Sequence, residues 1–183
     1  MIVLGLDVST SITGYCLLEK NKDTLSLLEA GSFSLSKIKN HFQKAELVKN
    51  ELLKIRKKFL VEKISIESSL QSFRPGMSSA KTLYSLAKFN GVVSYICYEV
   101  FCQEPEFVNA SSARSKLGLK IRRGEKNTKE QVLEWVETNP IFSDYEWPEK
   151  TLKNGPRRGK TIRDPCCYDI ADASVVALYT SGF

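Results

Sequence analysis

The chain opens with a dense run of hydrophobic residues that a single acid interrupts. Residues 1–8 are apolar or glycine except for Asp7, a pattern that predicts a strand buried on both faces. A polar, glycine-ended turn follows, and the patterns of residues 14–20 and 24–35 predict two further strands. Residues 21–23 between them have the composition of a tight turn. The front of the chain is therefore predicted to fold as an antiparallel meander.

The hydrophobic period changes after this meander. Apolar residues recur at steps of three and four from Ile38 to Phe59, which predicts a long amphipathic helix. Residues 63–69 return to strand character and carry a second acid, Glu67, where the strand enters a polar loop. A strand that follows a crossover helix of this length is expected to lie parallel to the first strand and beside it. This pairing would bring Asp7 and Glu67 together.

The second half of the chain alternates predicted helices with one short strand. Helices are expected at residues 80–102, at 111–117, from Thr128 onward with Thr128 as its cap, and at 168–179, with a strand at 105–109 and an irregular segment at 143–164. The helix over 80–102 is apolar on more than one face. It therefore needs two surfaces to pack on, and the second is either the interior of the fold or a second subunit.

Two more acids, Asp169 and Asp172, share one face of the last predicted helix because they are three residues apart. Each acid has a structural explanation when taken alone. Asp7 can hold the turn after its strand, Glu67 is ordinary at a strand end, and the last pair can favour the helix dipole.

As a group, the four acids point to a metal site. An unpaired carboxylate in an apolar strand costs several kcal/mol, and clustered acids need cations. Ligands that offer only oxygen select magnesium or manganese. Two such ions, about 3.5 to 4 Å apart, can bind both the attacking water and the leaving oxygen of a phosphodiester. The acids therefore favour metal-dependent nuclease chemistry.

The positive net charge of the chain indicates what kind of partner it binds. The formal net charge is +6 and the sequence pI is about 9.0, which favours a polyanion. One cluster opposes a single acid with Arg114, Lys116, Lys120, Arg122, Arg123, Lys126 and Lys129. A second run contains Lys153, Arg157, Arg158, Lys160 and Arg163. A solvated loop would explain such a cluster, but contact with a phosphate backbone explains the cationic density better.

Composition bounds the class of protein. With 183 residues and 42% hydrophobic residues, the chain is expected to form one domain, 1–183, with a basic insertion at about 143–164. No secretory leader or membrane-length apolar run is seen, so no membrane partner is expected. Five cysteines without a Cys-x-x-Cys pair predict reduced thiols rather than disulfides or zinc. These features favour a cytoplasmic protein that is not secreted.

Five motifs together resemble the RuvC-type Holliday-junction resolvases over most of the chain. They are Gly-Leu-Asp-Val-Ser-Thr-Ser-x-Thr-Gly at 5–14, Ile-Glu-Ser at 66–68, Leu-Ala-Lys-Phe-Asn-Gly-Val-Val at 86–93, Ala-Arg-Ser-Lys-Leu-Gly…Lys-Glu-Gln-Val at 113–132 and Asp-Ile-Ala-Asp-Ala at 169–173. The resemblance implies an α/β, ribonuclease H-like fold. Its mixed five-stranded sheet would have three antiparallel front strands, then parallel strands, with helices on both sides.

The resemblance also implies an activity and its ligands. The protein would be a homodimer in which each subunit nicks one of two opposed strands of a four-way DNA junction. Asp7 would be shared by both metals, Glu67 would be the ligand from the second strand, and Asp169 and Asp172 would be the helix ligands. Two Mg²⁺ ions per active site are implied, with Mn²⁺ as a substitute.

Contacts to DNA follow from the same resemblance. Arg114 and Lys129 would lie near the scissile phosphate, and Leu70 or Phe73 would be a wedge that unstacks bases at the crossover. The two basic clusters, rather than the resemblance, add Lys116, Lys120, Arg122, Arg123, Lys126, Arg157, Arg158 and Lys160 as expected DNA contacts, and Ser9 and Arg74 are expected contacts as well.

The insertion departs from the bacterial pattern and would suit a viral member, acting in the host cytoplasm, or an organellar one.

Two alternatives to the junction-resolving nuclease remain. They are a non-catalytic junction-binding module and a fragment of an actin-like or sugar-kinase-like phosphotransferase. The phosphotransferase would need a second lobe and a longer chain.

Overall fold

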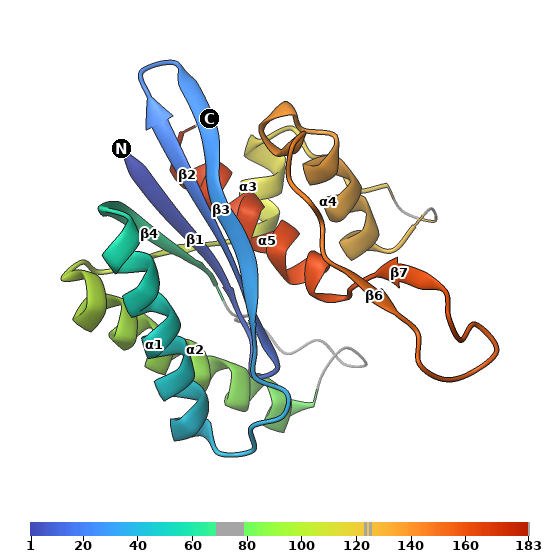
Figure 1. Ribbon diagram of the computed structural model, residues 1–183. Helices are drawn as coiled ribbons and strands as arrows, with labels where there is room; N and C mark the ends of the chain where they lie inside the picture. The colour runs from blue at the N-terminus through green and yellow to red at the C-terminus, as the bar shows by residue number, and fades with distance from the viewer. Residues whose placement is uncertain (69–78, 123, 125, 183) are drawn as a thin grey trace.

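A five-stranded mixed sheet forms the centre of the computed structural model, which describes residues 1–68, 79–122, 124 and 126–182 (Figure 1). The strands are β1 (Ile2–Val8), β2 (Ile12–Asn21), β3 (Thr24–Ser34), β4 (Val61–Glu67) and β5 (Glu106–Val108), in the order β3-β2-β1-β4-β5. The pairs β1–β2 and β2–β3 are antiparallel, whereas β1–β4 and β4–β5 are parallel. The predicted sheet and the predicted pairing of the first strand with the strand of Glu67 are confirmed.

Helices cover both faces of the sheet. On one face lie α1 (His41–Lys58) and α2 (Ala80–Phe101); on the other lie α3 (Ala110–Lys116), α4 (Thr128–Glu137) and α5 (Cys166–Thr180) (Figure 1). The alternation of side chains along a strand assigns residues of β1 to the two layers. Leu4 and Leu6 join the hydrophobic cluster under α1 and α2. Asp7 therefore lies on the α5 side, between the sheet and the last helix.

Two glycines allow α5 to lie against the backbone of the sheet. Gly14 pairs with Asp7 across the β1–β2 ladder, and a methyl group on Gly14 would overlap the carbonyl oxygen of Asp169. A methyl group on Gly5 would lie 2.5 Å from the carbonyl oxygen of Ala173. Because no side chain separates β1 and β2 from the helix at these points, the first turns of α5 are held close to Asp7.

Helix starts follow capping chemistry with one correction. The side chains of Asn40 and Ser79 accept hydrogen bonds from the first turns of α1 and α2. The predicted cap of α4, Thr128, is wrong. Thr128 is the first helical residue, and the side chain of Asn127 accepts from the backbone N–H of Glu130 at 2.9 Å. Asparagine and threonine are both good caps, so the sequence alone does not decide between neighbours.

The segment expected to be irregular contains regular structure, so that prediction is wrong. After a 3₁₀ turn, η1 (Pro140–Phe142), come the strands β6 (Glu149–Thr151) and β7 (Thr161–Arg163), which pair as an antiparallel hairpin. These strands lack the apolar alternation that marks a strand packed on a core. They were therefore not visible in the hydrophobic pattern. Helix α5 also begins at Cys166, two residues earlier than expected.

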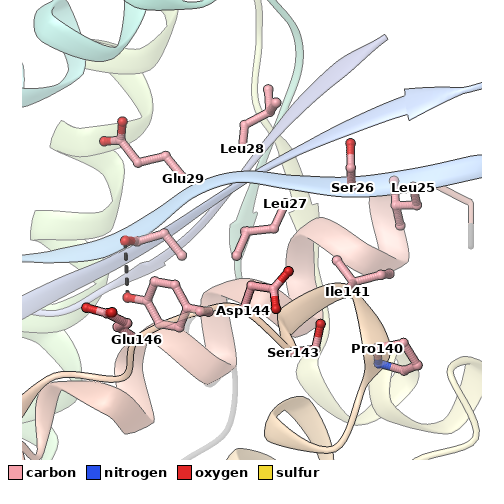
Figure 2. Close-up of a pocket in the computed structure, with 12 residues that line it drawn as sticks. Leu25, Ser26, Leu27, Leu28, Glu29, Pro140, Ile141, Ser143, Asp144 and Glu146 are labelled. Atoms are coloured by element: carbon pink, nitrogen blue, oxygen red, sulfur yellow. Dashed lines mark hydrogen bonds between the residues drawn. The ribbon is translucent and has the colours of Figure 1, made fainter.

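A groove of about 620 Å³ runs between β3 and the segment that begins with η1 (Figure 2). The hydroxyl of Tyr145 donates a hydrogen bond of 3.2 Å to the carbonyl oxygen of Ala30 across it. Glu29, Asp144 and Glu146 are among its acidic lining residues, and none of the four predicted metal ligands lines it.

Among the described helices, none combines the length and apolar character that crossing a bilayer requires.

Candidate active site

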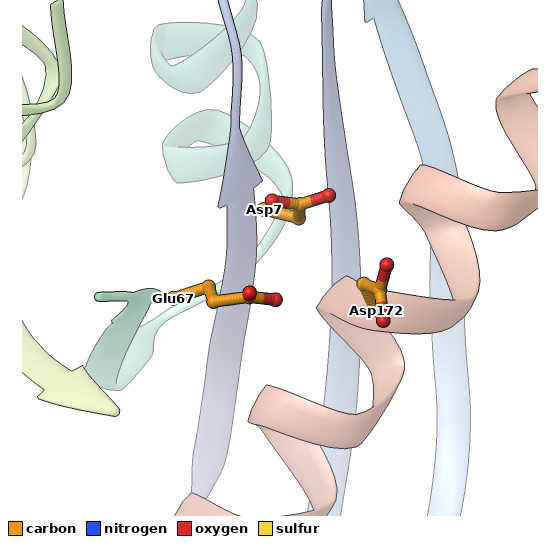
Figure 3. A group of neighbouring side chains, drawn as sticks. All are labelled: Asp7, Glu67 and Asp172. Carbon is orange, nitrogen blue, oxygen red and sulfur yellow. The ribbon is translucent and has the colours of Figure 1, made fainter. Parts of the chain in front are cut away.

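Three carboxylates from distant parts of the chain converge at one edge of the sheet. Asp7 lies near the end of β1, Glu67 ends β4, and Asp172 lies in α5, and each offers an oxygen within 4.8 Å of the others (Figure 3). Parallel neighbouring strands end at the same edge, which places Asp7 beside Glu67. The close approach of α5 supplies Asp172. The protein thus presents three oxygen donors around a common space.

Burial and mutual repulsion make Asp7 and Glu67 hard to ionise. Asp172 is 6% exposed, and Asp7 and Glu67 are partly buried. Burial, then the charge of Glu67, raises the pKa of Asp7 well above its usual range. Burial, then the charge of Asp172, raises the pKa of Glu67 to about 7. A cation placed between the three carboxylates would relieve both causes.

The fourth predicted ligand, Asp169, lies outside this group. It is one turn earlier on α5, and its carboxylate is 3.9 Å from the ammonium of Lys129. Burial raises the pKa of Asp169, while Lys129 acts in the opposite direction. Asp169 therefore borders the three clustered carboxylates and is held by a cation of the chain itself.

Arg114 is the second cation at the site. Its guanidinium donates to the carboxylate of Asp172 at 2.8 Å, and its buried Nε has no hydrogen-bond partner among the described residues. The four acids outnumber the cations Arg114 and Lys129 by two, and one divalent cation would balance that excess once all four acids are ionised. The donor set is all oxygen, which fits Mg²⁺ or Mn²⁺.

The other predicted DNA contacts fall into two groups on the described structure. One group lies on α3 and the α3–α4 connection, and its members Lys116, Lys120, Arg122 and Lys126 are exposed. The ammonium of Lys116 lies 4.7 Å from the ring centroid of Tyr179, and Lys126 pairs with Glu134. The other group, Arg157, Arg158 and Lys160, lies between β6 and β7.

Five predicted contacts need separate mention. Leu70, Phe73, Arg74 and Arg123 lie outside the described residues. Ser9 is described, and its hydroxyl is engaged within the turn after β1. It donates to the carbonyl oxygen of Ile12 at 2.6 Å and accepts from the backbone N–H groups of Ser11 and Ile12. The geometry assigns Ser9 a part in shaping this turn, and its contact with DNA stays a prediction.

Sequence reasoning missed two residues that support the site. A lysine such as Lys44 is expected on the polar, solvent-facing side of an amphipathic helix, yet Lys44 is only 9% exposed. Its ammonium donates to the carbonyl oxygen of Thr10 in the turn after β1. Asn90 is buried in α2, and its side-chain amide donates to the carbonyl oxygen of Glu67 at 3.2 Å. The signal that the sequence offers is the helical period. Lys44 and Asn90 are polar residues at positions where the three- and four-residue spacing of apolar residues predicts an inward side chain.

Comparisons with known proteins agree with this geometry. A protein of Aliarcobacter butzleri (strain RM4018) named crossover junction endodeoxyribonuclease RuvC is 32% identical over 180 residues, covering 97% of this chain and 96% of that protein. A protein of Campylobacter hominis with the same name is 28% identical over 109 residues, covering 58% of this chain and 64% of its own. No family model matches the chain.

Solved structures share the fold. The structure of T. thermophilus RuvC in complex with Holliday junction substrate superposes with a TM-score of 0.65 at 18% identity, covering 98% of this chain and 92% of that one. The yeast mitochondrial Holliday junction resolvase Ydc2 gives a TM-score of 0.58 at 18% identity, covering 98% and 77%. At these identities, the likeness shows a common architecture.

Proposed function

Because the chain belongs to the RuvC family of crossover junction endodeoxyribonucleases, we propose that it resolves four-way DNA junctions by paired, symmetric nicks. The reaction would be hydrolysis of one phosphodiester in each of two opposed strands. The observation that carries the proposal is the convergence of Asp7, Glu67 and Asp172 within 4.8 Å, beside exposed basic elements. A non-catalytic binding module would have no use for three carboxylates that come from distant parts of the chain and cluster below the surface.

Asp7, Glu67 and Asp172 would hold the metal, with Asp169 as the neighbouring fourth ligand. A bound pair of Mg²⁺ ions, for which Mn²⁺ is expected to substitute, would activate water and stabilise the leaving oxygen. Asp7 is suited to a shared position because β1 pairs with a strand on each side. Its backbone is therefore fixed from both edges, and the carboxylate geometry does not depend on a loop.

Arg114 and Lys129 would bind the scissile phosphate. Both already lie within ion-pair distance of site carboxylates, at 2.8 and 3.9 Å, so each cation is near the place where a phosphate would meet the metal ligands. A phosphate oxygen is a strong partner for a guanidinium because both can form two parallel hydrogen bonds. On binding DNA, Arg114 would move its hydrogen bonds from Asp172 to the phosphate and release that carboxylate for metal.

A homodimer is the assembly that paired nicks require. A four-way junction offers two equivalent strands, whereas the described part of one chain holds one group of clustered carboxylates. Helix α2 supplies a surface for a second copy, since its outer face exposes Tyr84, Val92, Tyr95 and Tyr98. Its inner face, with Phe89 and Val93, is already buried in the core. The exposure of this second apolar surface supports the proposal that a partner subunit would cover it.

Both helical layers pack on the same sheet, which supports a single nuclease domain over 1–183. The cysteines Cys16 and Cys97 are buried as free thiols, which is compatible with the proposed cytoplasmic location. Metal ligands come from the first strand and the last helix of this domain. Any division of the chain between them would therefore separate the parts of the active site.

The test is cleavage of a panel of branched and linear DNAs with each strand labelled separately, in magnesium. Symmetric nicks in two opposed strands of the four-way junction, with little cutting of linear duplex, are expected. Asp7→Asn serves as the matched inactive control, because it keeps the side-chain shape and removes the charge. Tight junction binding without nicks in either magnesium or manganese would reject the enzyme and leave the binding module.

A further inference from the structure

The hairpin formed by residues 149–163, here called the basic arm, carries a charge that nothing in the proposed cleavage reaction uses. Between residues 150 and 163 there are six cations and no acid. Arg163, at the base, forms an ion pair with Glu137. Within the described part of the chain, the cations between the strands, Lys153, Arg157, Arg158 and Lys160, are exposed and form no ion pair. Clustered like charges repel one another, so the arm is suited to a polyanionic partner.

The tip of the basic arm has a defined shape. Leu152 and Lys160 extend the hairpin beyond β6 and β7: the backbone N–H of Leu152 donates to the carbonyl oxygen of Lys160 at 3.0 Å. The backbone N–H of Arg158 closes the end by donating to the carbonyl oxygen of Gly155 at 3.0 Å. Gly155 and Gly159 have φ values of 82° and 83°, in the left-handed region that favours glycine. The cations are thus presented on an ordered turn.

The base of the basic arm is joined directly to the active-site helix. The backbone N–H of Asp164 donates to the carbonyl oxygen of Pro148 at 2.9 Å, which closes the two strands at their base. The side chain of Asp164 accepts from the backbone N–H of Cys166, the first residue of α5, at 2.9 Å. Trp147 packs edge-on against Tyr145, with ring centroids 4.9 Å apart. The arm's base therefore has a fixed position relative to Asp169 and Asp172.

The basic arm projects from the body of the protein beside the N-terminal end of α5 (Figure 1). Arg158 stands six positions before Asp164, which corresponds to about 20 Å at roughly 3.3 Å per residue. Phosphates of one DNA strand repeat about every 3.4 Å along the helix axis. The tip can therefore reach about six base pairs from the arm's base. A reach of this length is enough for the tip to contact a duplex several base pairs away from the active site.

We propose that the basic arm binds the sugar–phosphate backbone of one duplex arm of the junction, several base pairs from the cut. The inference rests on the proposed function, since the substrate that brings a duplex to this place is the junction. Lysine and arginine on an exposed turn bind phosphates without reading bases. The arm therefore adds affinity and orients the duplex, and it leaves sequence preference unchanged.

The test compares two triple variants with the same change in net charge. The arm variant carries Arg157→Gln, Arg158→Gln and Lys160→Gln. The control carries Lys54→Gln, Lys57→Gln and Lys58→Gln near the C-terminal end of α1, on the opposite face of the sheet. All six side chains are exposed, so both variants are expected to fold. Junction affinity is measured over a range of salt concentrations, with Asp7→Asn in every protein to prevent cleavage.

The arm variant is expected to bind the junction on the order of tenfold more weakly at about 0.1 M salt, and its log–log salt slope is expected to fall by roughly two to three. The control is expected to match the parent. The parent should bind more weakly to a junction that carries neutral methylphosphonates about six base pairs from the crossover. The affinity of the arm variant should not change with this modification. Equal weakening of both by the neutral patch, or an unchanged salt slope, would overturn the proposal.

The same measurement on linear duplex separates the two proposals. If the parent shows no preference for the junction, the proposed function fails. The arm is then still judged by whether the arm variant loses salt dependence on duplex relative to the control. If the parent prefers the junction and the arm variant binds like the control, the arm proposal alone fails, and its cations have another partner or none.

Discussion

The guanidinium of Arg114 lies 2.8 Å from the carboxylate of Asp172, which also faces Asp7 and Glu67. Asp172 thus belongs both to an ion pair with Arg114 and to the group of carboxylates suited to a metal. Because Arg114 and Lys129 offset two of the four negative charges at the site, one divalent ion completes the balance. A second ion would require Arg114 to leave Asp172, and an incoming phosphate offers Arg114 another partner.

Arg114→Gln is therefore expected to increase metal affinity in the absence of DNA. Removing a positive charge next to the ligands relieves roughly 1.4 kcal/mol or more of repulsion, which corresponds to about a tenfold lower Kd for Mn²⁺. Isothermal titration calorimetry with Mn²⁺ measures the effect. Lys116→Gln is the control, since Lys116 lies over the ring of Tyr179. Junction cleavage should fall in the Arg114 variant although its metal site is tighter. An unchanged Mn²⁺ affinity would contradict competition for Asp172.

Replacing the acids one at a time separates ligands from their neighbour. Asp7→Asn and Asp172→Asn are expected to reduce cleavage by roughly 100-fold or more, because each removes a proposed metal ligand. Junction binding should persist or improve, since a negative charge near phosphates is lost. The informative comparison is Asp169→Asn, three residues from Asp172 on the same helix. A much smaller loss would leave Asp169 as a partner of Lys129, whereas an equal loss would make it a full ligand.

Stability of the metal-free protein should depend on pH through Glu67. Its pKa is about 7 in the folded protein, above its ordinary value of 4.5. Between these values, the folded state binds more protons than the unfolded state, so the free energy of unfolding falls as pH rises through this window. The expected loss is roughly 1 to 3 kcal/mol.

Urea denaturation at several pH values in a chelator measures this loss. Glu67→Gln should reduce the dependence, because glutamine does not titrate, and the part that remains is expected from Asp7, whose pKa is raised as well. Excess Mg²⁺ should restore stability at the alkaline end, where the ionised carboxylates bind it best. A metal-free protein that becomes more stable as pH rises through this window, in a manner abolished by Glu67→Gln, would have the opposite sign and contradict the assigned cause.

Gly14→Ala should damage the active site without touching any charged group. The added methyl would overlap the backbone of Asp169, so α5 must move away from β2. Overpacking of this kind typically costs about 1 to 3 kcal/mol. Denaturation midpoint and Mn²⁺ affinity should both fall. Gly91→Ala in α2 is the control, since a methyl there meets nothing within 4 Å and alanine favours a helix. Wild-type Mn²⁺ affinity in the Gly14 variant would mean that the helix tolerates the shift.

The outer face of α2 is expected to control assembly. Tyr95 is 65% exposed in the single chain, and Tyr95→Asp would place a charge in the proposed interface. The variant should be monomeric by light scattering after size exclusion, and its nicks should appear singly rather than in pairs. Leu60→Asp is the control, since Leu60 is 83% exposed and lies outside α2. A Tyr95→Asp protein that remains dimeric would move the interface elsewhere.

The core of the site was predictable because the relevant physics is periodic and topological. The change of hydrophobic period between Leu35 and Ile38 separated strand from helix, and the crossover rule placed β4 beside β1. That rule alone predicts that Asp7 lies next to Glu67. The contribution of α5 rested on the motif around Asp169 and Asp172, since no local pattern reports where a last helix docks.

The unpredicted features depend on contacts between distant residues. The ion pair of Arg114 with Asp172 joins residues 58 positions apart. The β6–β7 hairpin lacks an apolar face and is held by backbone hydrogen bonds and by its base, so its strands leave little trace in hydropathy. Lys44 is a third example. Its charge predicts a solvent-exposed side chain, but its ammonium points inward because it donates a hydrogen bond to the carbonyl oxygen of Thr10.

The hydrogen bond from Tyr145 to Ala30 has a consequence for how molecules of this protein meet one another. Strand β3 lies at the end of the sheet, and an exposed edge strand of eleven residues is a template on which another chain can add a strand. The segment from Pro140 to Glu146 runs along this edge and occupies one of its carbonyl groups. It also brings Asp144 and Glu146 to the border of the strand, where like charges on two molecules repel. The same connection that leads to the basic arm thus leaves less of the β3 edge open to strand addition by a second molecule.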